Sequence, residues 1–211
     1  VIVTATRVAQ PITDVVADVT LIDRATIERS GAAALADLLV RAPGIAMTRN
    51  GGPGTTTSLY HRGAETRFTA VFVDGVRVDS QSTGGAAWNA LPVSQIDRIE
   101  ILRGPAAAIY GSDAIGGVIQ IFTSKDEPGF TPSVEIGAGT LGTYKLALGL
   151  SGGTETVDYA LGLAREISTG FNGQPTANSD LDGYQSNSVS GRVGFKVNAA
   201  HRLEATFLRN E

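Results

Sequence analysis

The sequence predicts an α+β region followed by a series of antiparallel β-strands, and three observations support that fold class. Residues 1–130 mix helical spacing of apolar residues with short β-branched runs. Residues 131–211 lose the helical spacing, and their apolar runs alternate with a period of two. These runs are about 8–11 residues long, which is the length that a tilted strand needs to cross a bilayer. The pattern alone leaves both a membrane barrel and a soluble sheet with one wet face open.

Two short helices are predicted near the start of the α+β region. Asp23 is a good N-cap for a helix that Gly31 would end, because Asp accepts backbone N–H groups and Gly tolerates positive φ. A second helix is predicted within AAALADLLVRAPG, where Leu35, Leu38 and Leu39 share one face and APG ends the helix.

A hairpin and two further strands are predicted before residue 125. AVFVDGVRV places Asp74-Gly75 between β-branched runs, and this pair favours a type I′ turn. IDRIEIL and GVIQIFT alternate and are rich in β-branched residues, so both are predicted strands. Later strands are predicted in PSVEIGAG, YKLALGLSG, VDYALGLARE, SVSGRVGFKV and RLEATFL, with a long polar loop at 167–187. About five strands cannot close a barrel, so we expect a piece of a longer chain.

Composition excludes several classes of function. The 211 residues carry a net charge of −4 and no basic patch, which argues against a nucleic-acid partner. The chain has no Cys, so it has neither disulfides nor a Cys-based metal site. GAGTLG at 137–142 matches G-x-G-x-x-G, but the alternating TYKLALGL that follows is no helix, so a hairpin turn is expected there.

No catalytic constellation is evident, and we do not expect an enzyme. His61 and His201 lie far apart in the sequence, and His61 beside Arg62 is expected to be a polar surface residue. Ser112 and Asp113 are neighbours without a third partner, which does not make a nucleophile and base pair.

Two short segments each leave two interpretations open. NSDLDG at 178–183 spaces oxygen-bearing side chains as a Ca²⁺ loop does, although Val189 stands where an EF-hand needs a bidentate Glu. The segment is either a cation site outside the EF-hand class or a solvated loop. VIVTA at residues 1–5 is either a first strand or an extended segment that adds to another protein's sheet.

Several motifs together resemble the TonB-dependent outer-membrane receptors. IDRIEILRGPAAAIYGSDAIGGVIQIFTSK, LADLLVRAPGI and VFVDGVRV are similar to plug-domain motifs, and VIVTATR is similar to a Ton box of the cobalamin branch. The resemblance implies an α+β plug domain inside a transmembrane antiparallel β-barrel of about 22 strands, of which only the first are present. It divides the chain into a Ton box segment at 1–7, a plug at 8–130 and barrel strands at 131–211.

The resemblance also implies a function and its partners. A receptor of this kind lies in the lipid of the bacterial outer membrane, binds cobalamin or a related corrinoid, and imports it with energy from TonB. TonB would grip the Ton box, formed by Val1, Ile2, Val3, Thr4 and Ala5. A ferric-siderophore or haem receptor of the same fold is the alternative, and so is a passive binding or adhesion module, which would need no Ton box.

The family's binding residues correspond to particular positions here. Glu65 departs from the cobalamin receptors, where a neutral amide is expected. No covalent cofactor is implied, and calcium is the expected metal. Arg103 is expected to pair with a barrel carboxylate, and Tyr110 to pack with its hydroxyl satisfied. The ligand positions are Thr56, Ser58, Glu65, Thr83 and Gly84, and the calcium positions are Asn172, Asn178, Asp180 and Asp182.

Overall fold

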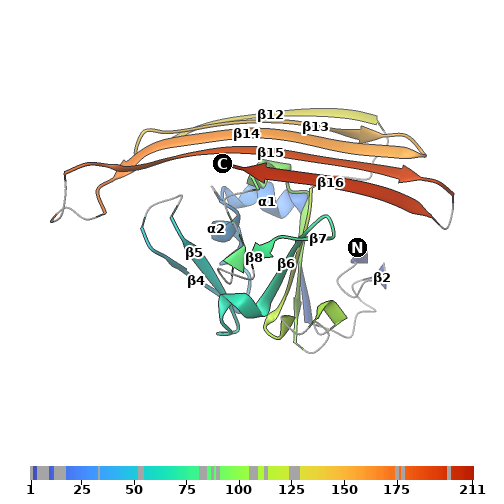
Figure 1. Cartoon of the computed structure of the whole chain (residues 1–211), viewed down its shortest axis with the longest axis horizontal. Helices are drawn as coiled ribbons and strands as arrows, with labels where there is room; N and C mark the ends of the chain where they lie inside the picture. The colour runs from blue at the N-terminus through green and yellow to red at the C-terminus, as the bar shows by residue number, and fades with distance from the viewer. Residues whose placement is uncertain are drawn as a thin grey trace. The chain divides into compact units, whose positions relative to one another are not determined.

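The computed structural model shows two compact units (Figure 1). The first unit comprises Val1–Thr48, Thr57–Trp88 and Ile96–Thr123, and the second comprises Arg49–Thr56, Asn89–Gln95 and Ser124–Glu211. Each unit is therefore assembled from segments that are separate in the sequence. The structure describes residues 2–3, 10–11, 18–32, 34–51, 55–80, 85–86, 88, 91–104, 109–111, 114–123, 129–173, 176, 179–198 and 201–211.

A five-stranded mixed sheet, in the order β3-β10-β11-β6-β7, organises the first unit (Figure 1). Strands β11 and β6 run parallel, and the other neighbours are antiparallel. The sheet strands are β3 (Asp18–Ile22), β6 (Thr69–Val73), β7 (Val76–Arg77), β10 (Arg98–Arg103) and β11 (Gly117–Phe122). Around it lie β1 (Ile2–Val3), β2 (Gln10–Pro11), α1 (Arg24–Ser30), α2 (Leu35–Leu39), β4 (Ile45–Arg49), β5 (Thr57–His61), η2 (Thr66–Phe68), β8 (Asp79–Ser80) and β9 (Gly85–Ala86).

Local signals place the two helices and the hairpin as the sequence predicts. The Asp23 carboxylate accepts a hydrogen bond from the backbone N of Thr26 at 2.8 Å, and Gly31 ends α1 with a φ of 59°. The hairpin between β6 and β7 has positive φ at both Asp74 (46°) and Gly75 (80°), as a type I′ turn requires. In α2, the three predicted core leucines are all buried.

Strands β10 and β11 are buried on both faces, which their alternating sequences do not indicate. Ile99 and Ile101 are fully buried, and so is the charged residue between them, Glu100. Glu100 is held by an ion pair with Arg98 at 3.1 Å. All but one residue of each strand are buried, so a polar side chain within them must be paired rather than exposed.

The Gly-rich insert between these strands has a packing role where the structure describes it. The ring of Tyr110 lies 5.4 Å from that of Phe72, centroid to centroid, and its hydroxyl accepts a hydrogen bond from Gln120 at 2.7 Å. The expectation that this hydroxyl is satisfied is therefore confirmed. The ring also packs on a small apolar cluster that includes Leu102 and Val118.

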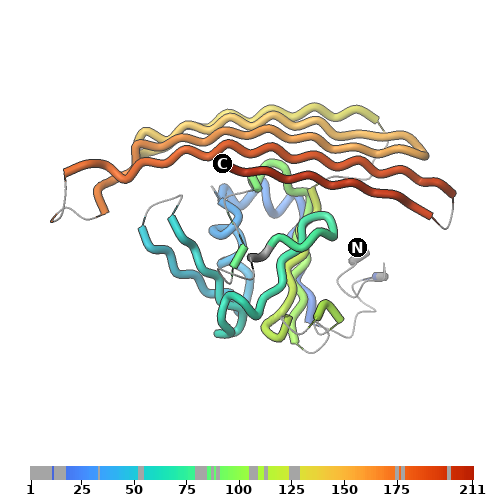
Figure 2. Tube along the Cα trace, viewed as in Figure 1, coloured from blue at the N-terminus to red at the C-terminus, as the bar shows by residue number. Residues whose placement is uncertain are grey.

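The second unit contains a five-stranded antiparallel sheet in sequence order, whose strands run side by side in Figure 2. Its strands are β12 (Gly129–Gly139), β13 (Thr143–Gly153), β14 (Val157–Phe171), β15 (Asp182–Lys196) and β16 (Arg202–Asn210), with η3 (Val93–Gln95) in the same unit. The predicted polar loop at 167–187 is too long. Residues 167–171 continue β14 and residues 182–187 belong to β15, because backbone pairing extends past the apolar part of each strand.

The two faces of this sheet differ in chemistry. One face presents exposed apolar side chains, such as Leu146, Leu148 and Leu163, at 42–52% exposure. The opposite face carries small and charged residues, including the ion pair of Lys145 with Glu135. An apolar outer face with a polar inner face is how the strands of an outer-membrane barrel are arranged. Among the described residues, no helix is long and apolar enough to cross a membrane.

Candidate functional site

The predicted ligand-binding residues fall in both compact units. Thr56 is exposed immediately before β5 and belongs to the second unit, and its carbonyl accepts a hydrogen bond from the backbone N of Asn50 at 3.1 Å. Ser58 is half-buried in β5 of the first unit. Thr83 and Gly84 lie outside the described residues. The five positions stay a prediction.

Glu65 does not present an isolated charge. Its carboxylate forms an ion pair with Arg67 at 2.7 Å, and both side chains are more than 60% exposed. The Arg67 guanidinium also lies over the ring of Phe68, 4.9 Å from its centroid. The local charge at this position is therefore offset within the same turn, although an exposed pair of this kind adds little stability.

The predicted calcium residues lie in and beside the connection between β14 and β15. Asp180 and Asp182 are exposed, Asn172 is half-buried, and Asn178 lies outside the described residues. The Asp182 carboxylate accepts a hydrogen bond from the backbone N of Gly173 at 2.6 Å, which draws the two ends of the connection together. The described donors are oxygen atoms, which suit a hard cation such as Ca²⁺. No cluster of three or more His, Cys, Asp or Glu side chains occurs among the described residues.

The Ton box segment is extended where it is described. Ile2 and Val3 form β1 and pair antiparallel with Pro11 and Gln10 of β2. Val1, Thr4 and Ala5 lie outside the described residues. An extended backbone is the conformation that strand addition to a partner requires.

A polar cluster around the buried Arg103 joins β3 and β10 in the first unit, and its Asp18 and Arg62 side chains are half exposed. Arg103 Nη1 donates to Asp18 Oδ1 at 3.1 Å and to Thr20 Oγ1 at 2.6 Å. Its Nη2 donates to the carbonyl of Pro43 at 2.9 Å. Arg62 Nη2 donates to the other oxygen of Asp18 at 2.6 Å. The Asp18 carboxylate of β3 therefore bridges two guanidinium groups. Arg103 is thus paired with a carboxylate of the first unit, and not with the barrel carboxylate that the sequence analysis expects.

His61 is not a surface residue, contrary to the prediction. Its side chain is 1% exposed, and neither ring nitrogen has a hydrogen-bond partner among the described residues. Burial, followed by the charges of Arg103 and Arg62, lowers the pKa of His61 from 6.5 to about 4. The ring lies against Gly117, where a Cβ atom would come within 2.2 Å of it. The prediction failed because the contact that buries His61 is made by a residue far along the chain.

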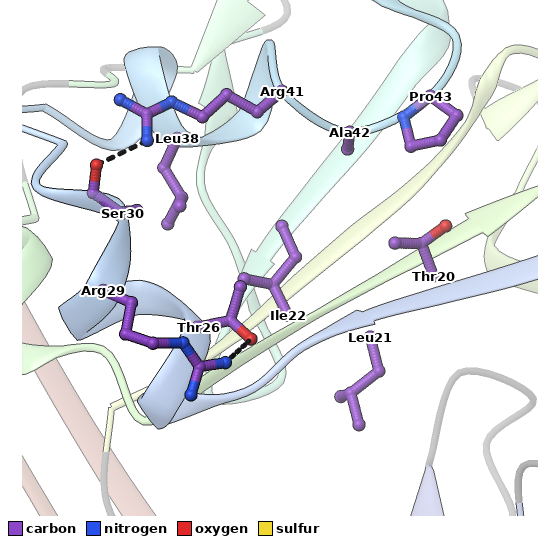
Figure 3. A pocket seen from close by; sticks show the side chains of 10 residues that line it. All are labelled: Thr20, Leu21, Ile22, Thr26, Arg29, Ser30, Leu38, Arg41, Ala42 and Pro43. Carbon is purple, nitrogen blue, oxygen red and sulfur yellow. Dashed lines mark hydrogen bonds between the residues drawn. The ribbon is translucent and has the colours of Figure 1, made fainter.

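A cavity of about 390 Å³ lies in the first unit, and no sequence motif signalled it (Figure 3). Its lining comes from β3, α1, α2 and the turn after α2, so no single segment carries its signature. Arg29 Nη2 donates to Thr26 Oγ1 at 3.3 Å, and Arg41 Nη1 donates to the carbonyl of Ser30 (Figure 3). The lining residues include no acid–base pair and no nucleophile with a base, so the cavity offers no catalytic constellation.

Comparison with known proteins identifies the family. The model of the TonB-dependent Receptor Plug Domain matches residues 11–118. The chain is 35% identical over 198 residues to the vitamin B12 transporter BtuB of Photobacterium profundum, which covers 93% of this chain and 32% of that protein. It is 42% identical over 140 residues to BtuB of Vibrio vulnificus, covering 66% of this chain and 23% of that protein. The chain thus spans a third or less of these relatives.

Solved structures show the same fold. The pyoverdine outer-membrane receptor FpvA of Pseudomonas aeruginosa matches with a TM-score of 0.76 and 22% identity, covering 96% of this chain and 28% of that one. The siderophore receptor PirA of Acinetobacter baumannii matches with a TM-score of 0.73 and 22% identity, covering 91% and 31%. The plug match, the curated relatives and these structures agree: the chain belongs to the TonB-dependent receptors of the bacterial outer membrane and comprises a plug domain with barrel strands.

Proposed function

We propose that the protein binds cobalamin or a related corrinoid and imports it actively across the outer membrane. The observation that carries this proposal is the 35% identity to a vitamin B12 transporter, which extends over 93% of the chain. That similarity covers the plug and the barrel strands alike. The siderophore receptors that match in structure are 22% identical, which supports the shared fold and not a shared ligand.

The proposed ligand residues have suitable chemistry for a corrinoid. Thr56 and Ser58 carry hydroxyl groups, which can donate to or accept from the amides at the rim of a corrin. Glu65 would present an unfavourable charge to a neutral rim if it were alone. Its ion pair with Arg67 offsets that charge, which removes one objection to a corrinoid.

We include a calcium site in the connection between β14 and β15. Asn172, Asn178, Asp180 and Asp182 would hold the ion, with further ligands from parts of the receptor outside this chain. Of this set, Asp180 is exposed, and Asp182 is exposed and accepts from Gly173 through one of its two carboxylate oxygens. Bound Ca²⁺ would neutralise the two carboxylates and order the loop.

The first test is calorimetric titration of the full-length receptor in detergent with cyanocobalamin, with and without Ca²⁺. We expect tight binding that weakens when Ca²⁺ is chelated, and we expect Asp180→Asn to weaken binding with Ca²⁺ present. Tight cyanocobalamin binding that is unchanged when Ca²⁺ is chelated would remove the metal from the proposal. No binding in either condition would contradict the corrinoid, and ferric siderophores and haem would then be titrated.

Transport energy is proposed to come from a TonB-type partner that pairs with residues 1–5. Val3→Pro should abolish uptake, because Pro lacks the backbone N–H that strand pairing uses. Val3→Ala keeps the N–H and serves as the matched control. Uptake by cells and ligand binding to the purified receptor are measured together, and binding should not change in either variant. Full uptake by the Pro variant would favour a passive binding module.

A further inference from the structure

Residues 89–95 interrupt the first unit and belong to the second. The residues on either side, Trp88 and Ile96, are 4% and 0% exposed and belong to the first unit. The chain therefore changes unit between residues 88 and 89 and again between 95 and 96. This short segment is grouped with the barrel strands although it lies inside the plug match at 11–118.

Gln95 makes a specific contact with the barrel sheet. Ser190 Oγ donates to Gln95 Oε1 at 2.6 Å. The amide of Gln95 also lies directly over Gly162, where a Cβ atom would be 2.3 Å from both its Cδ and its Nε2. Gly162 and Ser190 are register partners on β14 and β15. The Gln95 amide therefore lies over the register pair of Gly162 and Ser190, and only a glycine at position 162 leaves room for it.

The residues in register with this pair are small across four strands. Ser133 pairs with Gly149, Gly149 with Gly162, and Gly162 with Ser190. This row has no long side chain that would compete for the position of Gln95. Gln95 Nε2 has no hydrogen-bond partner among the described residues, so the hydrogen bond from Ser190 holds only one end of the amide.

A second segment of the plug region is held by the same strands. Arg49–Thr56 also belongs to the second unit. The Tyr184 hydroxyl of β15 donates to Glu166 of β14, and Arg49 is close enough to Tyr184 to act on it electrostatically. Two separate stretches of the first 130 residues thus belong to the same unit as β14 and β15.

We propose that residues 91–95, which the structure describes, are a stationary anchor, held to β14 and β15 by Gln95, and that they stay there when the sheet of the first unit is displaced. The role in transport rests on the proposed function. Removal of the plug as one rigid body would have to break the Gln95 contact. Local displacement or unfolding of the first unit would leave it intact. Gln95 is a positioning residue, since it holds backbone rather than ligand.

The first experiment needs no ligand. Val71 reports on the first unit and Val93 on the anchor, and both side chains are buried at 1% and 7% exposure. Each is replaced by Cys in the full-length receptor, and maleimide labelling is followed in rising urea in detergent. The 211 residues contain no Cys that would interfere. We expect Val71→Cys to be labelled at a lower urea concentration than Val93→Cys. Labelling of both cysteines with the same midpoint urea concentration would overturn the proposal.

A matched pair of second substitutions tests the role of Gln95 itself. Gln95→Ala should lower the labelling midpoint of Val93→Cys to that of Val71→Cys, and leave the latter unchanged. Gln185→Ala removes an exposed Gln from β15, whose carbonyl accepts from Arg165 at 3.5 Å, and should change neither midpoint. An unchanged Val93→Cys midpoint in Gln95→Ala would show that Gln95 is not the anchor.

The second experiment addresses transport. Gln95→Cys and Ser190→Cys are joined in cells by a reducible bis-methanethiosulfonate reagent, with each single variant as control. Cyanocobalamin uptake should be unchanged by the bridge. Uptake that is lost on bridging and regained on reduction would show that the segment must leave the barrel, which contradicts the proposal. If the unbridged receptor imports no corrinoid, the proposed function fails, and the urea experiment still decides the anchor.

Discussion

Single buried polar groups in the plug are paired with distant residues or are kept uncharged. Arg103 exemplifies the first case, with a carboxylate, a hydroxyl and a carbonyl around one guanidinium. His61 exemplifies the second, because its ring is buried without hydrogen bonds beside two positive charges. A buried cation without a partner is costly, so the neutral imidazole is the form that the folded plug accepts.

Acid should therefore destabilise the plug through His61. The pKa of His61 is about 4 in the folded plug and 6.5 in the reference state. The stability that neutral His61 contributes is therefore complete above pH 6.5 and is lost as the pH falls toward 4. The loss is at most about 3 kcal/mol at about 1.36 kcal/mol per pKa unit. Urea unfolding of the full-length receptor at pH 7 and pH 4.5 measures it.

Substitution separates this effect from the titration of carboxylates. His61→Leu cannot be protonated, so its stability should fall less between pH 7 and pH 4.5 than that of the parent. His201→Leu is the matched control, because His201 is exposed and its ring is hydrogen-bonded to Asn198 in the same turn. It should retain the full pH dependence. An equal pH dependence in His61→Leu and the parent would refute this assignment.

At the scale of elements, the hairpin turn between β6 and β7 also secures the end of β11. The Asp74 carboxylate accepts hydrogen bonds from the backbone N of Thr123 at 2.9 Å and from its hydroxyl, and Asp74 N donates to Ile121 at 2.9 Å. The turn residue thus ties together strands that are parallel neighbours in the sheet. The turn type follows from the local sequence, whereas this second role depends on tertiary structure.

Asp74→Ala should destabilise the plug by about 1–3 kcal/mol, because it leaves the backbone N of Thr123 without its acceptor. Asp74→Asn keeps an acceptor oxygen and tolerates positive φ, so its loss should be smaller. Urea unfolding of both full-length variants at neutral pH provides the comparison. Equal losses for Ala and Asn would mean that charge, not the acceptor, is what matters.

The sequence predicts those elements whose signals are local. The Asp23 cap, the Gly31 stop and the Asp74-Gly75 turn each act within a few residues, and all three occur as expected. The alternation in IDRIEIL predicts a strand, but it does not predict that Glu100 within this strand is fully buried. Burial of His61 depends on a residue more than fifty positions away.

The candidate sites follow the same division. Motif spacing pointed to the family and to the loop that contains Asp180 and Asp182, because those residues are close in sequence. It did not point to the cavity of Figure 3, which is lined by three elements and a turn. Motif spacing also did not point to Gln95, because its contacts Gly162 and Ser190 lie 67 and 95 residues further along the chain.

At the scale of the whole molecule, the sheet of the second unit separates lipid from the barrel interior. Its outward positions are apolar and exposed in this chain, and its inward positions carry small residues, ion pairs and hydrogen bonds. The stability of such a sheet in a bilayer depends on which face a charge is placed on.

Leu148→Arg should therefore destabilise the folded receptor in lipid by about 2–4 kcal/mol, because it places a charge near the middle of an outward face. Ser186→Arg is the matched control, since Ser186 faces inward and is the register partner of Glu166. It should cost far less. Denaturant-induced unfolding of the full-length receptor in vesicles measures both, and similar losses would contradict the assignment of faces.

The fit of the Gln95 amide over Gly162 has a consequence for how the two positions evolve. Any side chain at 162 would collide with the amide, whereas a short residue at 95 would remove the obstacle. The sizes of the residues at positions 95 and 162 therefore limit each other, although the two positions lie far apart in the sequence. Across natural variants, Gly162→Ala should occur together with Gln95→Ser or Gln95→Ala, and rarely beside an intact glutamine.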